Sequence, residues 1–292
     1  MPRALPILLA ASLLAFAEDP PPADDTGAKV MERVNVFRKL AGLTPVTLDA
    51  ALSKGCASHA AYLLENQENP ATRGLGAHNE DPKLPGYTKE GEEAGRSADI
   101  HYIEPVRAVD GWMASLFHRT PLLEPSLAKI GFGAVENGER GWFVVVDVMG
   151  GKGGGKKPAG KGVQPVVYPK DKQKDVPLAF GGEVPDPIPE DRDDHAGYPI
   201  TAQFPPGVPV KEASVGLKDA EGKLIECWIS TPDKPADARY QRNTVCAISK
   251  DVLKPGVTYT VNMAAKVGGR PWAAEWKFTT EGEAEKPPAP PK

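Results

Sequence analysis

The sequence predicts an α+β fold, with a mixed helix-and-strand domain at residues 27–150 and an all-β sandwich at residues 163–281. Three observations support this prediction. Apolar residues recur at helical spacing in the first region, short strand-like runs alternate with turns in the second, and a stretch rich in glycine and lysine separates the two. A chain of 292 residues also has the length of about two domains.

Composition excludes several classes of protein. The net charge is −4, from 35 basic and 39 acidic residues, so no basic excess points to a nucleic-acid partner. The only long apolar run lies at the N-terminus, which excludes a polytopic membrane protein. Three cysteines are too few for a disulfide-dense scaffold.

Residues 1–17 have the pattern of a signal peptide. A short positive region precedes an apolar run that ends in the cleavage-site pattern Ala15-Phe16-Ala17. The run is about 14 residues long, whereas a bilayer-spanning helix needs about 20, so we expect cleavage after Ala17 rather than a retained anchor. The sequence therefore predicts an extracytoplasmic protein, in the periplasm or secreted, with no transmembrane anchor after cleavage.

The rest of the chain is expected to divide by composition. The segments are a disordered lead-in at 18–26, the mixed domain at 27–150, a Gly/Lys-rich linker at 151–162, the β-sandwich at 163–281 and a disordered tail at 282–292.

Three helices and two strands are expected in the first domain. The apolar spacing predicts helices over 26–42, 47–63 and 105–117, and strands over 129–135 and 141–149. Cys56 and His59 lie on the apolar stripe of the second helix, so we expect both to pack in the core. Asn137 and Gly138 predict a turn between the two strands.

Four stretches of this domain carry a family resemblance. They are AGLTPVTLDAAL (41–52), the alanine-rich helix ALSKGCASHAAYL (51–63), His78 followed by KEGEEAGRS (89–97), and WMASLFHRTPLLEPSLAKIGFG (112–133). Together they resemble the CAP superfamily, or SCP domain, of cysteine-rich secretory, antigen 5 and pathogenesis-related proteins. The last stretch is the most specific, because it resembles the W-x-x-S-x-x-H-R pattern of the bacterial branch. The resemblance implies a three-layer α-β-α sandwich with a central cleft.

The resemblance also implies which residues line the cleft. Two histidines and acidic residues do so in the family, and here they match His78, Glu92 and His118. Glu93 is an alternative in register, because the family's G-E-N segment corresponds to Gly91-Glu92-Glu93. Ser115 stands where many eukaryotic members carry a second glutamate. Since one cleft ligand is replaced, we expect that no cofactor is required.

Two interpretations of the cleft stay open. His78, Glu92 and His118 are residue types that bind zinc or another divalent metal, and three ligands would leave a position open for water. The interpretation that we favour is a polar cluster with a structural or ligand-binding role. His101 is a further candidate for the cleft.

A hydrolase with its own nucleophile has little support. The sequence contains neither a G-x-S-x-G nor an H-E-x-x-H motif. Ser115 and His118 are three residues apart on one predicted helix and can touch, but nothing shows an oxyanion hole or an orienting acid. We expect Ser115 to be a small residue at a helix contact, and no catalytic residue is assigned.

The second domain resembles a bacterial immunoglobulin-like module of the fibronectin-III type. Its strands are expected at 163–169, 177–185, 198–205, 211–230 (a hairpin), 243–249, 258–267 and 271–280. The segment LKPGVTY (253–259) resembles a tyrosine corner, in which the hydroxyl of Tyr259 bonds back to the backbone. The ending WKFTT (276–280) is also typical of such modules.

Two further features of the second domain need an interpretation. Cys227 and Cys246 lie in predicted strands, and export permits a disulfide between them, although two buried thiols are the alternative. Of the two, we favour the disulfide. The acidic segment EVPDPIPEDRDDH (183–195) is interpreted as a solvated loop rather than a calcium site.

Three functions compete at this point. The first is an extracytoplasmic binding protein whose cleft takes a small-molecule, lipid, peptide or cell-envelope ligand, with the β-domain as an accessory module. The second is a secreted hydrolase, such as a metal-assisted peptidase, that uses the same cleft. The third is a structural envelope protein. The missing glutamate and the lack of a visible nucleophile favour the first, a protein that is not an enzyme.

Overall fold

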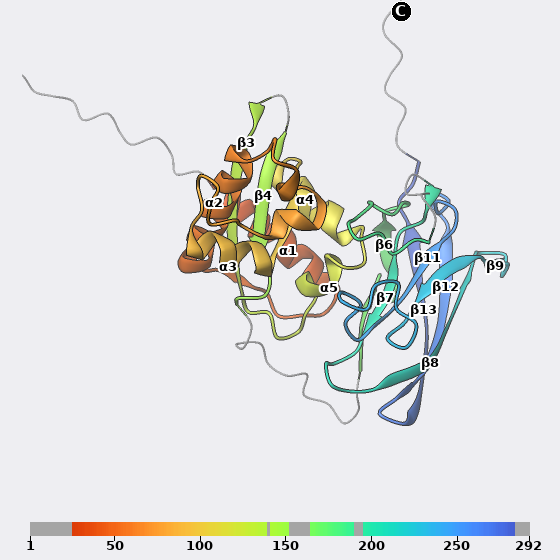
Figure 1. Ribbon diagram of the computed structural model, residues 1–292. Coiled ribbons are helices and arrows are strands. Elements are labelled where there is room, and N and C mark those ends of the chain that lie inside the picture. The colour runs from red at the N-terminus through yellow and green to blue at the C-terminus, as the bar shows by residue number, and fades with distance from the viewer. Residues whose placement is uncertain (1–24, 139–140, 152–163, 190–194, 284–292) are drawn as a thin grey trace, which may run out of the picture.

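A computed structural model describes residues 25–138, 141–151, 164–189 and 195–283. A region of helices around a sheet, residues 25–151, lies beside an all-β region, residues 164–283 (Figure 1). The predicted signal peptide, the linker apart from Gly151 and most of the tail and the lead-in lie outside the described residues. Within the described ranges, no helix combines the length and the hydropathy needed to cross a bilayer.

The first region is a sheet covered by helices on both faces. Its strands lie in the order β1-β3-β4-β2, with β1 parallel to β3 and the other neighbours antiparallel. The bounds are β1 Thr47–Leu48, β2 Ala98–His101, β3 Lys129–Glu136 and β4 Trp142–Asp147. The helices are α1 Thr26–Leu40, α2 Ala50–Glu65, α3 Lys89–Ser97, α4 Pro105–Met113 and α5 Arg119–Leu122, with 3₁₀ turns at Pro70–Thr72 and Gly74–His78.

Strand β4 shows why the region has three layers. Val144 and Val146 pack with α1 and α4 in one apolar cluster, whereas Phe143 and Val145 pack with α2 and α3 in another. Successive side chains of a strand point to opposite faces, so a strand that is apolar throughout needs cover on both sides. The predicted three-layer α-β-α arrangement is therefore confirmed.

The helices differ from the predictions mainly at their ends. The helix predicted from residue 47 begins at Ala50, because Thr47 lies in β1 and the N-cap is Asp49, whose carboxylate accepts hydrogen bonds from the backbone N–H groups of Ala51 and Leu52. The helix predicted over 105–117 ends at Met113. Beyond it, the Ser115 hydroxyl donates to the carbonyl of Trp112, and the chain turns before α5.

The second region consists of two packed sheets, with strand orders β10-β11-β7-β5 and β6-β13-β12-β8-β9. The first sheet contains β5 Val166–Tyr168, β7 Ile200–Gln203, β10 Cys227–Ser230 and β11 Thr244–Ser249. The second contains β6 Gln173–Val176, β8 Val210–Lys218, β9 Leu224–Ile225, β12 Thr258–Val267 and β13 Arg270–Thr280. Tyr259 forms the expected corner, since its hydroxyl accepts a hydrogen bond of 2.9 Å from the backbone N–H of Lys254.

One predicted strand is wrong. Residues 177–185 form only an isolated bridge, between Ala179 and Gly197, and then leave the sandwich. We call this segment the interdomain arm, because it crosses to the helical region. The sequence also did not predict β6, which pairs in parallel with β13 at the edge of the second sheet.

The two regions share a continuous interface. One apolar cluster contains residues of both, including Phe37 of α1 and Tyr168 of β5. Arg119 of α5 is fully buried there and donates to the carbonyls of Met113 and Pro199, one in each region. Its guanidinium carbon lies 4.5 Å from the ring centroid of Tyr198. A buried charge with these partners holds the β-sandwich against α5.

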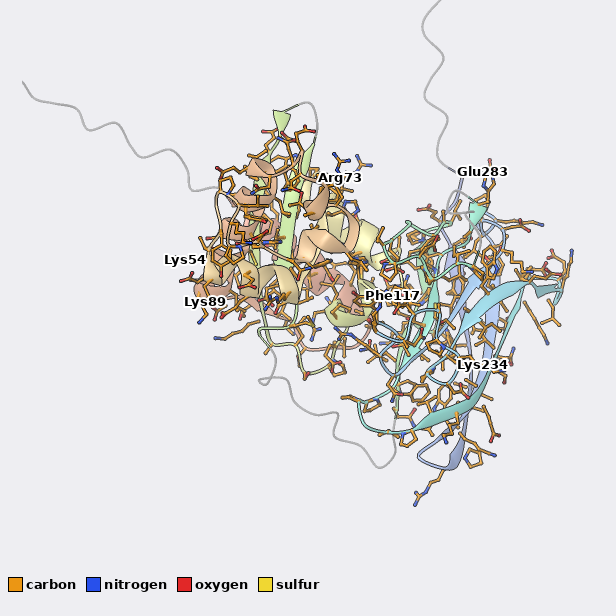
Figure 2. The ribbon with its side chains drawn as sticks, in the orientation of Figure 1. Lys54, Arg73, Lys89, Phe117, Lys234 and Glu283 are labelled. Carbon is orange, nitrogen blue, oxygen red and sulfur yellow. The ribbon has the colours of Figure 1, made fainter. Side chains whose placement is uncertain are left out.

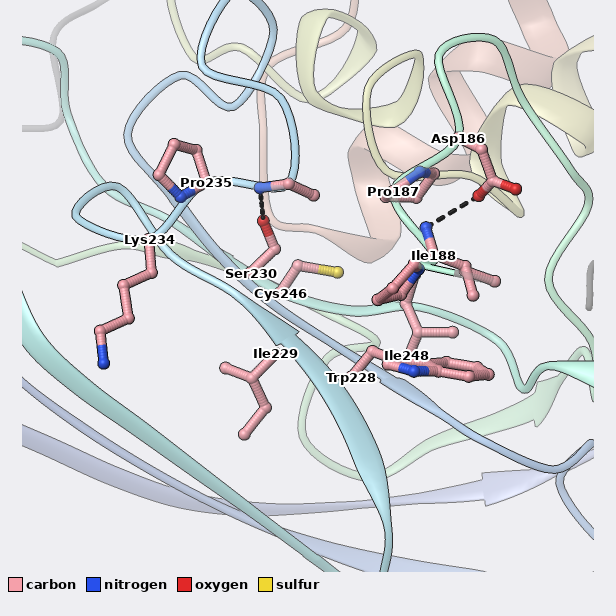
Figure 3. A pocket seen from close by; sticks show the side chains of 12 residues that line it. Asp186, Pro187, Ile188, Trp228, Ile229, Ser230, Lys234, Pro235, Cys246 and Ile248 are labelled. Atoms are coloured by element: carbon pink, nitrogen blue, oxygen red, sulfur yellow. Dashed lines mark hydrogen bonds between the residues drawn. The ribbon is translucent and has the colours of Figure 1, made fainter. Parts of the chain in front are cut away.

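The expected disulfide between Cys227 and Cys246 is not formed, and all three cysteines are free. Cys227 of β10 lies opposite Ser249, whereas Cys246 of β11 lies opposite Ser230, so the two cysteines are three register positions apart. An odd offset also points them to opposite faces of the sheet. Cys246 lines a cavity of about 280 Å³ beside Ser230 (Figure 3). Cys227, in contrast, packs against the main core.

Candidate functional site: a cleft between the two regions

The interdomain arm approaches the helical region through two glycines. The backbone N–H of Gly181 donates to the carbonyl of Ala114 at 2.8 Å. A Cβ at position 181 would lie 3.0 Å from the Cβ of Ala114, so a larger residue would push the arm away. Gly182 has a φ of 71°, a left-handed conformation that favours glycine. The pair therefore delivers the next residue, Glu183, to the turn between α4 and α5.

Glu183 is the central contact of the arm. Its carboxylate accepts hydrogen bonds from the backbone N–H groups of Leu116 (2.7 Å) and Phe117 (2.8 Å). It also contacts Nδ1 of His118 at 3.0 Å, and its side chain is only 1% exposed. Phe117 lies at the boundary between the two regions (Figure 2). The segment expected to be a solvated acidic loop therefore begins with a buried glutamate, and that expectation is wrong for Glu183.

His118 is held by this carboxylate in one orientation. Burial alone would lower its pKa, but the hydrogen bond to Glu183 and the charges of Asp99 and Glu183 outweigh burial and raise the pKa. The ring is thus favoured in its charged form, with Nδ1 directed at Glu183. Nε2 has no hydrogen-bond partner among the described residues, and His118 lines two cavities.

The other two histidines of the cleft have the opposite preference. Nδ1 of His78 lies 3.0 Å from the carbonyl of Gly95, and burial, together with the charge of His118, lowers the pKa of His78. Burial and His118 lower the pKa of His101 to about 4. The pKa shifts therefore favour the charged form of His118 and the neutral forms of His78 and His101.

Asp99 is the most unusual group at the cleft. It lies on β2, is 4% exposed, and its Oδ2 has no hydrogen-bond partner in the described structure. Burial raises the pKa of Asp99 to about 7, although the charges of His118 and Arg242 act in the opposite direction. A buried carboxyl oxygen without a partner is costly, and such groups are typical of sites that await a ligand.

These residues line two neighbouring cavities. The larger one, which we call the interdomain cleft, has a volume of about 450 Å³. The helical region contributes Leu75, His78, Asn79, Arg96, Ala98, Asp99, Phe117, His118, Pro121, Val148 and Met149, and the β-region contributes Val184, Pro185, Arg239, Tyr240 and Arg242. The smaller cavity, of about 240 Å³, shares His78, His118 and Val184 and is also lined by His101 and Ser115.

The structure places the predicted site residues in different surroundings. His78 and His118 line the same two cavities, whereas Glu92 lines neither. The carboxylate of Glu92 contacts Arg96 and accepts a hydrogen bond of 3.1 Å from the hydroxyl of Tyr87. Glu93 is exposed and lies 3.9 Å from Lys89. The described residues contain no group of three or more His, Cys, Asp or Glu side chains that could hold a metal ion, so the predicted His78, Glu92 and His118 set is not assembled.

Ser115 and His59 form contacts within the helical region. Ser115 is 1% exposed, and its hydroxyl donates to the Trp112 carbonyl at 2.9 Å rather than to His118. His59 is fully buried on α2, as expected, and contacts Glu80 at 2.9 Å and the carbonyl of Ala77 at 2.8 Å. Three residues of the site were not predicted from the sequence, because no local motif contains them. They are Asp99 and Arg242, which line the cleft, and Glu183.

One comparison with known proteins identifies the domain type of the helical region. The sequence model of the cysteine-rich secretory protein family, CAP, matches residues 31–148, so this part of the chain is a CAP domain. No curated protein matches the sequence. Among solved structures, the chain is similar to CopC from Methylosinus trichosporium OB3b, with 16% identity and a TM-score of 0.28 over 43% of this chain and 99% of that one.

The chain is also similar to a second solved structure, again at low sequence identity. It is a DUF4426 family protein from Pseudomonas aeruginosa PAO1, with 12% identity and a TM-score of 0.23 over 32% of this chain and 80% of that protein. Both are likenesses to the β-rich region. At these identities and TM-scores, neither carries a functional conclusion for this chain.

Proposed function

We propose that the protein is an extracytoplasmic binding protein that takes a small ligand in the interdomain cleft. The observation that carries the proposal is the unpartnered, buried Oδ2 of Asp99 at the wall of a cavity of about 450 Å³. A cavity of this size accommodates a small organic molecule, and convergent polar groups on an otherwise mixed wall are typical of binding sites. In this proposal the β-region, an immunoglobulin-like accessory module, forms one wall of the site instead of acting as a spacer.

The location outside the cytoplasm is part of the same proposal. It rests on the signal-peptide pattern of residues 1–17 and on the CAP domain, whose family is named for secreted proteins. The ligand would then be a component of the periplasm, the envelope or the surrounding medium. No cofactor is needed for such a function.

Ligand-observed NMR of the mature protein with a library of small polar and aromatic fragments tests this function. Asn79 is exposed at the cleft, and its side chain makes only a long hydrogen bond of 3.5 Å to Leu75, so Asn79→Trp should block the cleft without disturbing the fold. Glu221→Trp, on the exposed turn after β8, is the matched control. We expect a subset of fragments that bind the wild type and the control but not the Asn79→Trp variant. If no such subset exists, the binding function is wrong and the structural role remains.

A hydrolase is the second candidate, and one contact favours it. A carboxylate on Nδ1 that fixes the imidazole, with Nε2 directed elsewhere, is the arrangement of a general acid–base histidine. His118 and Glu183 have this arrangement. Turnover of ester or peptide libraries that disappears in His118→Gln, with fragment binding retained, would support the hydrolase over the binding protein.

A further inference from the structure

Arg242 differs from the other two arginines of the cleft. Arg239 lies against the carboxylate of Asp237 through two nitrogens, and Arg96 contacts Glu92, so both of these charges are neutralised. Arg242 is half-buried, and its Nη2 lies 3.4 Å from the sulfur of Met149, across the boundary between the regions. No carboxylate contacts it among the described residues.

The backbone holds Arg242 in an unusual conformation. Its φ is 50°, a left-handed value that costs a non-glycine residue about 1–3 kcal/mol. The flanking residues keep it there, because Gln241 is buried and donates to the carbonyl of Thr244 at 2.6 Å, while Asn243 donates to the carbonyls of Pro205 and Val208. The segment between β10 and β11 is therefore rigidly built where it presents Arg242 to the cleft.

Asp99 and Arg242 both line this cleft. Their charges influence each other, since Arg242 acts to lower the pKa of Asp99, but no ion pair joins them. Two opposite charges that share a cavity without contact leave one acceptor and one donor group unused. A molecule between them can satisfy both at once.

We propose that the cleft binds a small carboxylic acid that carries a hydroxyl or amino group next to its carboxylate. The proposal rests on the binding function above and names the chemical class of its ligand. The carboxylate lies on the guanidinium of Arg242, whose planar fork matches a carboxylate through two parallel hydrogen bonds. The neighbouring hydroxyl or amino group donates to the carboxylate of Asp99, which lines the cleft.

The charges of the site favour a carboxylate over a phosphate. Among the described residues that line the cleft, Arg242 is the one guanidinium without a carboxylate partner, and Asp99 lines the same cavity. A phosphate dianion would place two negative charges beside Asp99, whereas a carboxylate places one, which the guanidinium of Arg242 balances. Phe117 and Tyr240, whose ring centroids lie 5.9 Å apart, add an apolar wall for the remainder of the ligand.

Four probes of nearly equal size separate the parts of this ligand. They are mandelate (hydroxyl and carboxylate), phenylglycine (amino group and carboxylate), phenylacetate (carboxylate alone) and 1-phenyl-1,2-ethanediol (no carboxylate). Titration calorimetry of the mature protein at pH 7.5 should show saturable binding of mandelate or phenylglycine. Phenylacetate should bind about tenfold more weakly, and the diol should not bind.

Three variants locate the two contacts. Arg242→Gln should weaken mandelate or phenylglycine binding at least tenfold, whereas Arg270→Gln, at the exposed start of β13, should leave it unchanged. Asp99→Asn should remove the advantage of these two probes over phenylacetate. Circular dichroism of each variant establishes that it is folded.

The outcomes also separate this inference from the binding function. If neither mandelate nor phenylglycine binds at 50 mM, or if Arg242→Gln binds them as the wild type does, the ligand class is wrong. Fragments that bind the wild type but not Asn79→Trp, and that lack a carboxylate, would overturn the ligand class while the binding function stands. The absence of any cleft-dependent fragment would overturn both.

Discussion

The molecule contains two histidine–glutamate pairs of nearly the same length and opposite character. His59 and Glu80 lie 2.9 Å apart inside the CAP domain, and both side chains are fully buried. His118 and Glu183 lie 3.0 Å apart across the boundary between the regions, and His118 is 16% exposed toward the cleft. The same two residue types therefore serve as an internal brace in one place and as a wall of a cavity in the other.

The second ring nitrogen distinguishes the two pairs. Both nitrogens of His59 face oxygen acceptors, the Glu80 carboxylate and the Ala77 carbonyl, so the ring has no free position. Glu80 is also engaged, since it accepts from the backbone N–H of Thr88. The packing is so close that a Cβ on Gly95 of α3 would lie 2.5 Å from the His59 ring. His118, in contrast, has one ring nitrogen, Nε2, that is available to a ligand in the cleft. A fully satisfied pair stabilises the fold, and a half-satisfied pair is available for function.

The largest expected effect comes from breaking the internal pair. Glu80→Ala removes the carboxylate that contacts the buried His59 ring and accepts from the backbone N–H of Thr88, and the loss of these two hydrogen-bond partners together costs about 3–5 kcal/mol. We expect the free energy of unfolding, measured by urea denaturation, to fall by this amount. Glu93→Ala, which removes an exposed carboxylate from the same region, should change it by less than about 0.5 kcal/mol. Equal stabilities of the two variants would contradict the assignment of His59 and Glu80 as a brace.

The bridging pair should give a smaller and more local effect. Glu183→Ala removes the acceptor of three backbone N–H groups, those of residues 116–118, and of the His118 ring, and we expect a loss of about 3 kcal/mol. Hydrogen exchange should accelerate at residues 114–118 and in the interdomain arm, but not in α2. Glu226→Ala, which breaks the exposed pair with Lys250, is the control. Faster exchange throughout the CAP domain would mean that Glu183 is a global rather than an interface contact.

The sequence predicted the two pairs unequally, and the reason is physical. His59 lies on a helix whose apolar stripe has a local period, so its burial is visible in the sequence. His118 and His78 were found through a resemblance that covers the CAP domain. Glu183 is separated from His118 by 65 positions, and its segment appeared as a strand followed by an acidic loop. Glu183 is buried only because the β-region docks against the helical region. Contacts between two docked regions produce no periodic pattern in the sequence.

The same limit applies to Asp99 and Arg242. Asp99 lies on a short edge strand, and Arg242 lies in a connection between strands, so neither belongs to a motif. The layers of both regions could be predicted because alternation and helical period reflect local burial. The interdomain cleft could not, because it depends on how two independent patterns pack together.

The pH dependence of stability tests the environment of Asp99. Its pKa rises from 3.8 to about 7 on folding, so the native state favours the protonated form. The stability that protonated Asp99 contributes is fully present below pH 3.8 and is lost as the pH rises through 7. Asp99→Asn should therefore stabilise the protein by on the order of 4 kcal/mol at pH 9, since the pKa rises by about three units and each unit corresponds to about 1.4 kcal/mol, and have almost no effect at pH 4. Asp251→Asn, at an exposed carboxylate, should show no such pH dependence. A gain of Asp99→Asn that is the same at both pH values would contradict the raised pKa.

The smallest expected effect concerns the cysteines, where the structure overturned the expected pairing. A disulfide needs Cα atoms within about 7 Å, but three register positions along a strand separate Cys227 from the position opposite Cys246 by about 10 Å. Dithiothreitol should therefore leave the unfolding midpoint unchanged, and three thiols should react with Ellman's reagent in denaturant without prior reduction. One reactive thiol, together with a midpoint that falls by several degrees on reduction, would mean that β10 and β11 pair in a different register. The register also places Trp228 opposite Ile248 beside the cavity of about 280 Å³ that Cys246 lines, so the same result would change the lining of that cavity.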